Sequence, residues 1–182
     1  MITIPHITTP RLSLVQATLE ILSADLTDRT TLADLLNATI PGTWPPPLLD
    51  QDALMFFIKM VQEESDPHFS SWYWILKGPD QEKGILIGSG GVVSHSEEEG
   101  TVMIGYSVLD DFQNLGYATE AVAHMIPVIF SFPGVLRILA TTYPELPASV
   151  RVLEKNGFIP VSVQTSGEGM EEGTIAYVRE KN

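Results

Sequence analysis

The sequence predicts a mixed α/β fold in a single domain covering residues 1–182. The predicted elements run in the order strand, helices, three strands, helix, strand, helix and two strands, which is typical of helices packed on a mixed sheet. An amphipathic stretch at residues 117–130 lies between two strand-like stretches and predicts a central β-α-β unit. The length suits one domain, and 44% hydrophobic with 18% charged residues indicates a globular chain.

The N-terminal half is predicted to hold one strand and several helical turns. Residues 7–16 contain an alternating run, Arg11-Leu12-Ser13-Leu14-Val15, and predict a single strand. Residues 19–38 carry leucines at helical spacing, so they predict a helix that is either continuous or broken in two near its middle. A further helix is expected to begin at an N-cap formed by Asp50 or Asp52.

The C-terminal half is predicted to hold most of the sheet. Predicted strands cover residues 72–77, 84–95, 101–109, 135–142, 158–164 and 173–179, and predicted helices cover residues 117–130 and 148–156. The first three of these strands are expected to form a meander, and the last two a hairpin. Gly157 is expected to end the second helix. The glycines at 88, 90 and 91 lie inside a strand, so they predict room for a neighbouring group or a bulge.

The composition excludes several classes of function. A net charge of −13 disfavours nucleic acid as a partner, because phosphate contacts need clustered Lys and Arg. This charge either keeps the surface soluble or attracts a cationic substrate such as an amine. No apolar run approaches the ~20 residues of a membrane span, and residues 1–10 do not resemble a signal peptide, so we expect a cytoplasmic protein without membrane contact. There is no cysteine and no metal-ligand spacing of histidines, so no metal site is expected.

The best chemical signal lies between a predicted strand and the helix at 117–130, in Gln113-Asn114-Leu115-Gly116-Tyr117-Ala118. A helix N-terminus presents unpaired N–H groups and partial positive charge, and glycine lets a phosphate approach the backbone. Residues 110–120 contain no Lys or Arg, so backbone amides would have to do most of the phosphate binding. The alternative is an ordinary strand-to-helix turn in which glycine only allows tightness.

Two motifs in the right order resemble the GNAT superfamily of acetyltransferases. Gln113-x-x-Gly116-x-Ala118 resembles its Gln/Arg-x-x-Gly-x-Gly/Ala signature. The segment from Ala148 through Ser149 to Phe158 resembles the Ser-x-x-x-Leu-Glu-Lys-x-Gly-Phe block of the branch with the ribosomal-protein-alanine acetyltransferases. Thr9-Pro10-Arg11-Leu12 resembles the first strand of that branch. The resemblance covers nearly the whole chain, although only residues 101–158 are specific.

The resemblance implies the GNAT fold and acetyl-CoA as cosubstrate. In that superfamily the strand matching residues 101–109 carries a bulge and splays from the next strand, and coenzyme A lies in the gap. A neutral amine then attacks the thioester in a ternary complex, with one backbone amide polarising the carbonyl. The residues implied in cofactor binding are Val108, Gln113, Asn114, Leu115, Gly116, Tyr117, Ala118, Thr119 and Ser149. The implied acceptor is a small-molecule or peptide amine.

The sequence departs from the family pattern at the acid and base positions. Met103 stands where a general-base Glu is common, Leu153 where many members have a Tyr acid, and Leu146 where an Asn is common. These departures make Ser149 the candidate catalytic residue, as proton donor to the leaving thiolate or as a cofactor ligand. The alternative is that Ser149 caps the helix that follows it. Trp44, in the extended Pro-rich loop, is the candidate acceptor-lining residue.

The missing base leaves two questions open. Glu97, Glu98, Glu99 or His95 could act on the acceptor through water, although a solvated acidic turn is the plainer interpretation. The absent Glu and Tyr also favour a rival function, a non-catalytic module that binds or senses acyl-CoA. A homodimer is a further open alternative.

Overall fold

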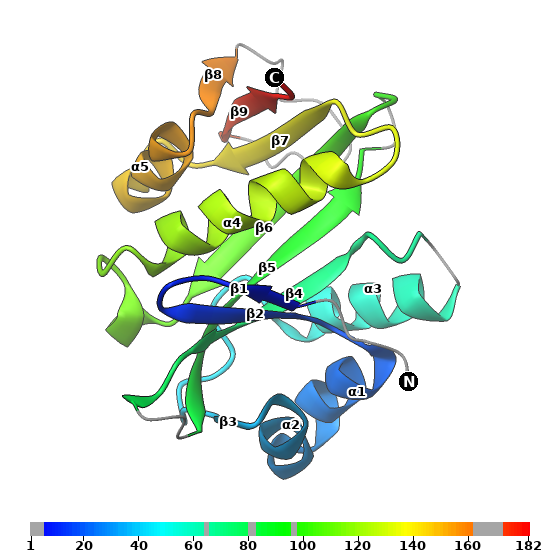
Figure 1. Ribbon diagram of the computed structural model, residues 1–182, viewed down its shortest axis with the longest axis vertical. Helices are drawn as coiled ribbons and strands as arrows, with labels where there is room; N and C mark the ends of the chain where they lie inside the picture. The colour runs from blue at the N-terminus through cyan, green and yellow to red at the C-terminus, as the bar shows by residue number, and fades with distance from the viewer. Residues whose placement is uncertain (1–5, 64–65, 80–82, 96–97, 162–172) are drawn as a thin grey trace.

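The computed structural model describes residues 6–63, 66–79, 83–95, 98–161 and 173–182 (Figure 1). One mixed sheet of nine strands organises these residues, in the order β1-β2-β4-β5-β6-β7-β9-β8, with β3 pairing beside β5. The β6–β7 and β3–β5 pairs are parallel and the other strand pairs are antiparallel. The mixed α/β prediction is therefore confirmed.

The elements of the N-terminal half are β1 (His6–Thr8), β2 (Leu12–Gln16), α1 (Leu19–Thr27), α2 (Arg29–Leu36), β3 (Ala38–Thr39) and α3 (Gln51–Gln62). Those of the C-terminal half are β4 (Ser70–Leu76), β5 (Gly84–Ser94), β6 (Thr101–Val108), a 3₁₀ turn (Asp110–Phe112), α4 (Tyr117–Ser131), β7 (Arg137–Thr142), α5 (Pro147–Lys155), β8 (Ile159–Val161) and β9 (Ile175–Glu180). The predicted meander is β4-β5-β6, and α4 crosses between the parallel strands β6 and β7 as predicted.

Local capping explains where the N-terminal elements begin and end. The strand predicted over residues 7–16 is in fact a hairpin of β1 and β2, which turns where Thr9 N donates to Leu12 O at 2.9 Å. Asp28 breaks the helical region in two, because its carboxylate accepts the first free N–H groups of α2. Asp50 is the N-cap of α3 and accepts from Ala53 N at 2.8 Å.

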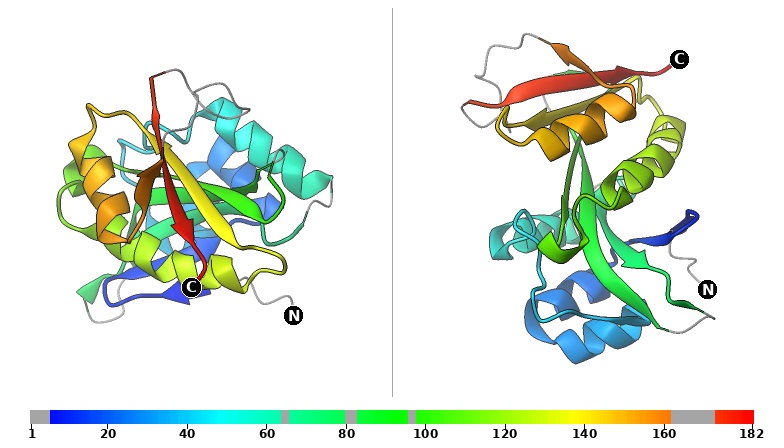
Figure 2. Two further views of the ribbon diagram at one scale, coloured as in Figure 1. Left: turned by 90° about the horizontal axis from the view of Figure 1, so that it is seen from above. Right: turned by 90° about the vertical axis from the view of Figure 1, so that its left-hand side faces the viewer.

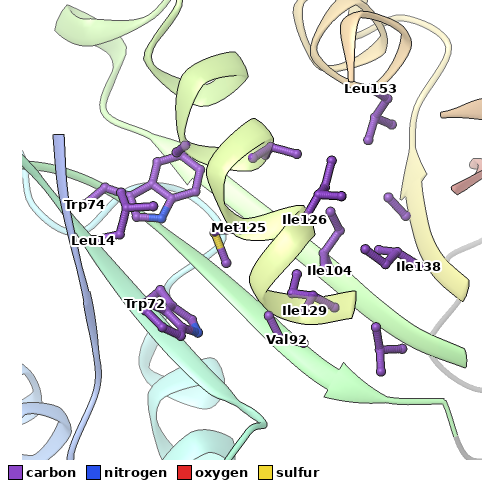
Figure 3. Packing of buried hydrophobic residues seen from close by; sticks show 14 of the residues in the cluster. Leu14, Trp72, Trp74, Val92, Ile104, Met125, Ile126, Ile129, Ile138 and Leu153 are labelled. Carbon is purple, nitrogen blue, oxygen red and sulfur yellow. The ribbon is translucent and has the colours of Figure 1, made fainter. Parts of the chain in front are cut away.

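The helices cover the sheet on both faces (Figure 2). On one face α4 packs its apolar side onto a cluster that includes Trp74, Ile104, Met125 and Ile129, all buried (Figure 3). On the other face α1, α2 and α3 pack over a second cluster around Tyr73 of β4. The central strands are therefore packed against helices on both faces.

Strands β6 and β7 diverge after three residue pairs. Thr101, Val102 and Met103 pair with β7, whereas residues 104–108 pair with β5 alone among the described strands. Apart from its three residue pairs with β6, β7 pairs only with β9 in the described part of the chain. The splayed strand pair expected from the family resemblance is thus confirmed, and we call this divergence the fork.

The bulge expected on β6 is not there. The β5–β6 register runs without interruption from Gly88–Val108 to Ser94–Val102, and the irregularity lies instead between β4 and β5 at Trp74 and Ile75. Gly90 of β5 makes room for the indole of Trp74, since a Cβ there would come within 2.9 Å of that ring, and a Cβ on Gly91 would come within 2.7 Å of the ring of Phe57. The prediction that these glycines make room for a neighbour is confirmed.

Candidate active site

The N-terminus of α4 stands directly beside the fork. Gly116 is the residue before the helix and has a left-handed backbone with φ +82°, which glycine adopts without strain. Asn114 is also left-handed, with φ +60°. No side chain of the described residues caps the helix, so its first N–H groups are available to a ligand. The turn therefore has the geometry of an anion site that backbone amides would form.

Gln113 holds this turn against the end of β6. Its side-chain amide donates to Val108 O and to Asp110 Oδ1, both at 3.0 Å. The side chain is therefore engaged within the turn, so its part in the site is to fix the position of the loop relative to the fork. Leu115 and Asn114 are exposed, whereas Tyr117, Ala118 and Thr119 are half-buried in the first turn of α4.

Sequence reasoning missed a cation at this turn. Arg11, from the hairpin turn between β1 and β2, donates from Nη1 to Leu115 O at 2.9 Å, and its guanidinium lies 4.5 Å from the ring centre of Tyr117. A Cβ on Gly116 would lie 3.3 Å from Nη2 of Arg11. The positive charge that residues 110–120 lack is thus brought in from the other end of the chain. In the sequence, Arg11 was noted only within the segment Thr9-Pro10-Arg11-Leu12 that resembles the family's first strand, and this resemblance gave Arg11 no role in the site.

Glu120 anchors that cation. Its carboxylate accepts from Arg11 Nε at 2.6 Å, from Arg11 N at 2.7 Å and from Thr9 Oγ1 at 2.6 Å. Burial alone would raise the pKa of Glu120, but the hydrogen bonds from Thr9 and Arg11 and the charge of Arg11 outweigh it and lower the pKa below its ordinary value. Glu120 is therefore ionised at neutral pH and fixes Arg11 beside the helix terminus.

Ser149 lies on the other side of the fork, in the first turn of α5. The N-cap of α5 is Leu146 and Pro147 opens the helix, so the alternative that Ser149 is the cap is wrong. The hydroxyl of Tyr106 in β6 lies 3.3 Å from Ser149 O and 3.4 Å from Ser149 Oγ. The half-buried hydroxyls of Tyr106, from β6, and Ser149, from α5, therefore lie next to each other across the fork.

Tyr106 was not singled out in the sequence, where it appears only as part of the Gly-Tyr string. Its ring is stacked on Trp74, with 6.3 Å between ring centres. Burial raises the pKa of Tyr106 to about 12, although the hydrogen bond with Ser149 works in the opposite direction. Tyr106 is consequently protonated at neutral pH and can donate a hydrogen bond.

The fork is open on the face that carries α3. Gly91 and Gly105 are cross-strand partners, so their Cα–H bonds face the same side. A Cβ on Gly91 would strike the ring of Phe57 in α3, at 2.7 Å, which identifies the side. A Cβ on Gly105 would meet nothing within 4 Å. On the α4 side, by contrast, the space beside Gly105 is a hollow of only about 10 Å³. The α3 side is therefore the side from which a molecule can approach the fork.

Met103 shares this open face, because it is two residues before Gly105 on the same strand. Its half-buried side chain packs with Leu139, Ala176 and Val178. The open face of β6 therefore presents Met103, Gly105 and Ser107. A thioether, that of Met103, stands at the position where a carboxylate would have acted as general base.

Trp44 lies in the core rather than on an open surface. Its side chain is 2% exposed, and its indole N–H donates to Asp25 Oδ1 at 2.7 Å. The other oxygen of Asp25 accepts from the Tyr73 hydroxyl at 2.6 Å. Burial raises the pKa of Asp25, although the Tyr73 and Trp44 bonds and the charge of Arg29 partly offset it. The interpretation of Trp44 as acceptor-lining stays a prediction.

The remaining candidate bases lie near the β5–β6 turn. Glu98 pairs with Arg137 at 3.2 Å, and Glu99 is exposed. His95 follows directly after β5, and Glu97 lies outside the described residues. In the part of the chain that the structure describes, no group of three or more His, Asp or Glu side chains is arranged to hold a metal ion. No described helix is both long and apolar enough to cross a membrane.

A GNAT acetyltransferase domain model matches residues 18–159, and the chain therefore belongs to the GNAT acetyltransferase family. It is an acyltransferase that uses acetyl-CoA. Among curated proteins it is similar to the uncharacterized N-acetyltransferase YjdG of Bacillus subtilis (strain 168), with 29% identity over 118 residues, 65% of this chain and 68% of YjdG.

Solved structures agree on the fold. The ribosomal-protein-S5-alanine acetyltransferase of Vibrio fischeri has a TM-score of 0.63 and 16% identity, covering 97% of this chain and 96% of that one. RimJ of Mycobacterium smegmatis, solved with a coenzyme A disulfide, has a TM-score of 0.61 and 17% identity, covering 97% and 86%. At these identities the likeness concerns the fold.

Proposed function

We propose that this protein transfers the acetyl group of acetyl-CoA to a primary amine, either a peptide α-amine or a small-molecule amine, by direct attack in a ternary complex. One observation carries the proposal: the uncapped N-terminus of α4 lies beside the fork that leaves the backbone of residues 104–108 without a partner on the β7 side. A helix N-terminus suits a pyrophosphate, and an unpaired strand edge suits an extended arm that contains amides. A cofactor with both groups needs these two features side by side.

The first part of the proposal concerns the cofactor. Backbone N–H groups from Asn114 to Thr119 bind the pyrophosphate, and Gly116 leaves the space for it. Arg11 adds positive charge beside those amides, held there by Glu120. The free backbone edge of β6, ending at Val108, pairs with the amides of the pantetheine arm as an added strand would. Ser149 and Tyr106 then lie close to the thioester end of that arm.

The second part concerns the reaction. The acceptor enters over Gly105, where the α3 face is open, and its neutral nitrogen attacks the thioester carbon. The new C–N bond forms, the C–S bond breaks, and the thiolate takes a proton from the Ser149 hydroxyl or through it from Tyr106. The hydroxyl that gave the proton regains one from water. Water carries away the proton that the amine nitrogen loses, since the described open face of β6 holds no carboxylate.

The sequence also leaves open a module that binds acyl-CoA without catalysis, because Met103 stands in the base position. Membership of the GNAT acetyltransferase family favours the enzyme over that module. Thiol release from acetyl-CoA separates the two. Mixed with pools of primary amines, the enzyme is expected to release free coenzyme A and to yield acetylated amines identifiable by mass. Saturable acetyl-CoA binding without turnover across broad amine pools would instead support the binding module.

A further inference from the structure

A second hollow lies beside the C-terminal half of α4, toward the opposite end of the helix from Gly116. It has a volume of about 790 Å³ and is bordered by the C-terminal half of α4, the end of α5 and the end of β9, which gather in the upper part of Figure 1. Its floor is apolar and includes Ile126, Pro127 and Phe130. Pro127 is eleven residues along α4 from Gly116, so the two sites are separated by about 16 Å of helix.

Cations border this apolar floor. Lys155, Arg179 and Lys181 line the hollow, although the chain has only 10 Lys and Arg residues and a net charge of −13. Among the described residues, none of the three forms a salt bridge with a carboxylate. The acidic residue that lines the hollow, Glu180, is already paired with Arg137 at 2.8 Å. The hollow therefore has a net positive charge in an otherwise acidic protein.

Arg179 is the most firmly placed of the three cations. Its guanidinium lies over the end of α5, where Nη1 donates to Gly157 O at 3.3 Å, and a Cβ on Gly157 would overlap it. Its Nε is buried and has no hydrogen-bond partner among the described residues. Within the same part of the chain, Lys181 donates to a backbone carbonyl, that of Val135, at 3.4 Å. A charged group held in place without an opposite charge is stabilised when an anion binds.

We propose that this hollow binds a small organic anion that carries an apolar chain, with a carboxylate or phosphate head. The volume lies within the range of small-molecule sites. The apolar floor contacts the chain, and Arg179 and Lys181 contact the head. An inorganic anion would leave the floor uncovered, and a neutral lipid would leave the cations unpaired. The site is independent of the acetyl transfer proposed above.

The test is calorimetric titration of the full chain with octanoate, with octyl phosphate and with octanol as the uncharged control. One or both anions are expected to bind saturably, octanol is not, and saturating coenzyme A should leave the binding in place. Lys181→Gln, which changes an exposed side chain, and Arg179→Gln should each weaken the affinity roughly tenfold, the loss expected for one charge-assisted contact. Arg151→Gln, an exposed change elsewhere on α5, should not.

Several results would overturn the proposal. Neither anion binding would exclude the site, and equal affinity in Lys181→Gln and the parent would exclude the assigned cations. If coenzyme A displaced the bound anion, the anion would be binding at the cofactor site and not in the hollow. If neither small anion bound but an acidic peptide did, the hollow would be a protein-docking surface instead. Thermal unfolding of Arg179→Gln checks that its loss of binding is not a loss of fold.

Discussion

Arg11 and Glu120 form a 2.6 Å ion pair at the N-terminus of α4, although they are 109 residues apart in the sequence. The pair ties the hairpin of β1 and β2 to the helix that starts beside the fork. Residues 110–120 themselves contain three acidic side chains and no Lys or Arg. The contact therefore changes the electrostatics of the turn, because it places a guanidinium next to Gly116.

Glu120 is expected to make stability depend on acidity. Its pKa is lowered in the folded state, so its contribution is fully present above the unfolded value of 4.5 and is lost as the pH falls through the folded value. Glu120→Gln should cost about 2 kcal/mol of unfolding free energy at pH 7, where hydrogen bonds to a charged group are lost. The difference in unfolding free energy between variant and parent should shrink as the pH falls below 4.5.

Chemical denaturation at pH 7 and pH 3.5 measures that difference. Glu154→Gln, an exposed change on α5, is the control and should have little effect at either pH. If Glu120→Gln lowered the free energy of unfolding by the same amount at both pH values, packing rather than ionisation would account for the contribution of Glu120 to stability.

Ser149 and Tyr106 can be separated by their kinetics. Ser149→Ala should lower kcat more than it raises the KM for acetyl-CoA if the hydroxyl protonates the leaving thiolate. Because Ser149 is inside α5 rather than at its cap, the change should cost little stability. Tyr106→Phe removes the neighbouring hydroxyl while keeping the ring on Trp74, and should lower kcat less if it acts only through Ser149. Unchanged turnover in both variants would remove these hydroxyls from the mechanism.

The open face of β6 predicts which amines react. With Met103 where a base would stand, the protein has to use the neutral fraction of its acceptor. A peptide α-amine has a pKa of about 7.7–8.0 and lysine about 10.4, so the α-amine has roughly several hundredfold more neutral form at the same pH. We expect a higher kcat/KM at pH 7 for a short peptide with a free N-terminus than for the same peptide blocked there and carrying lysine.

Raising the pH to 9 should narrow the gap between the two peptides. Preference for the lysine side chain at pH 7 would contradict the prediction and would indicate an effective base outside the described open face.

Most of the fold could be predicted because its signals are local. Apolar periodicity located α4 and the meander β4-β5-β6, and the αL residue Gly157, with φ +74°, ended α5 as expected. The N-terminal hairpin was missed because the alternating run of residues 11–15 predicts one strand, and the turn signal of Pro10 directly before that run was overlooked. Pro147 was the missed signal for the start of α5, since proline is favoured in the first helical position, and this made Ser149 look like a cap.

The site was harder to predict because several of its features depend on contacts between distant segments. Strand periodicity cannot reveal that Tyr106 meets Ser149, or that Gly91 and Gly105 pair to leave an open face beside Phe57. Trp44 is buried in the cluster around Tyr73 and bonds to Asp25, contacts that no local pattern indicates. The cytoplasmic location and a homodimer stay predictions.

The central claim is that the turn before α4 binds the phosphates of acetyl-CoA. Calorimetric titration of acetyl-CoA into the parent protein and into Gly116→Asp tests it most directly. The aspartate would repel the phosphates, crowd their site and compete for Arg11, while the helix behind it stays folded. The prediction is saturable one-to-one binding by the parent and no measurable binding by the variant, with a cooperative unfolding transition in both. Equal affinity of the two proteins would contradict the assigned site.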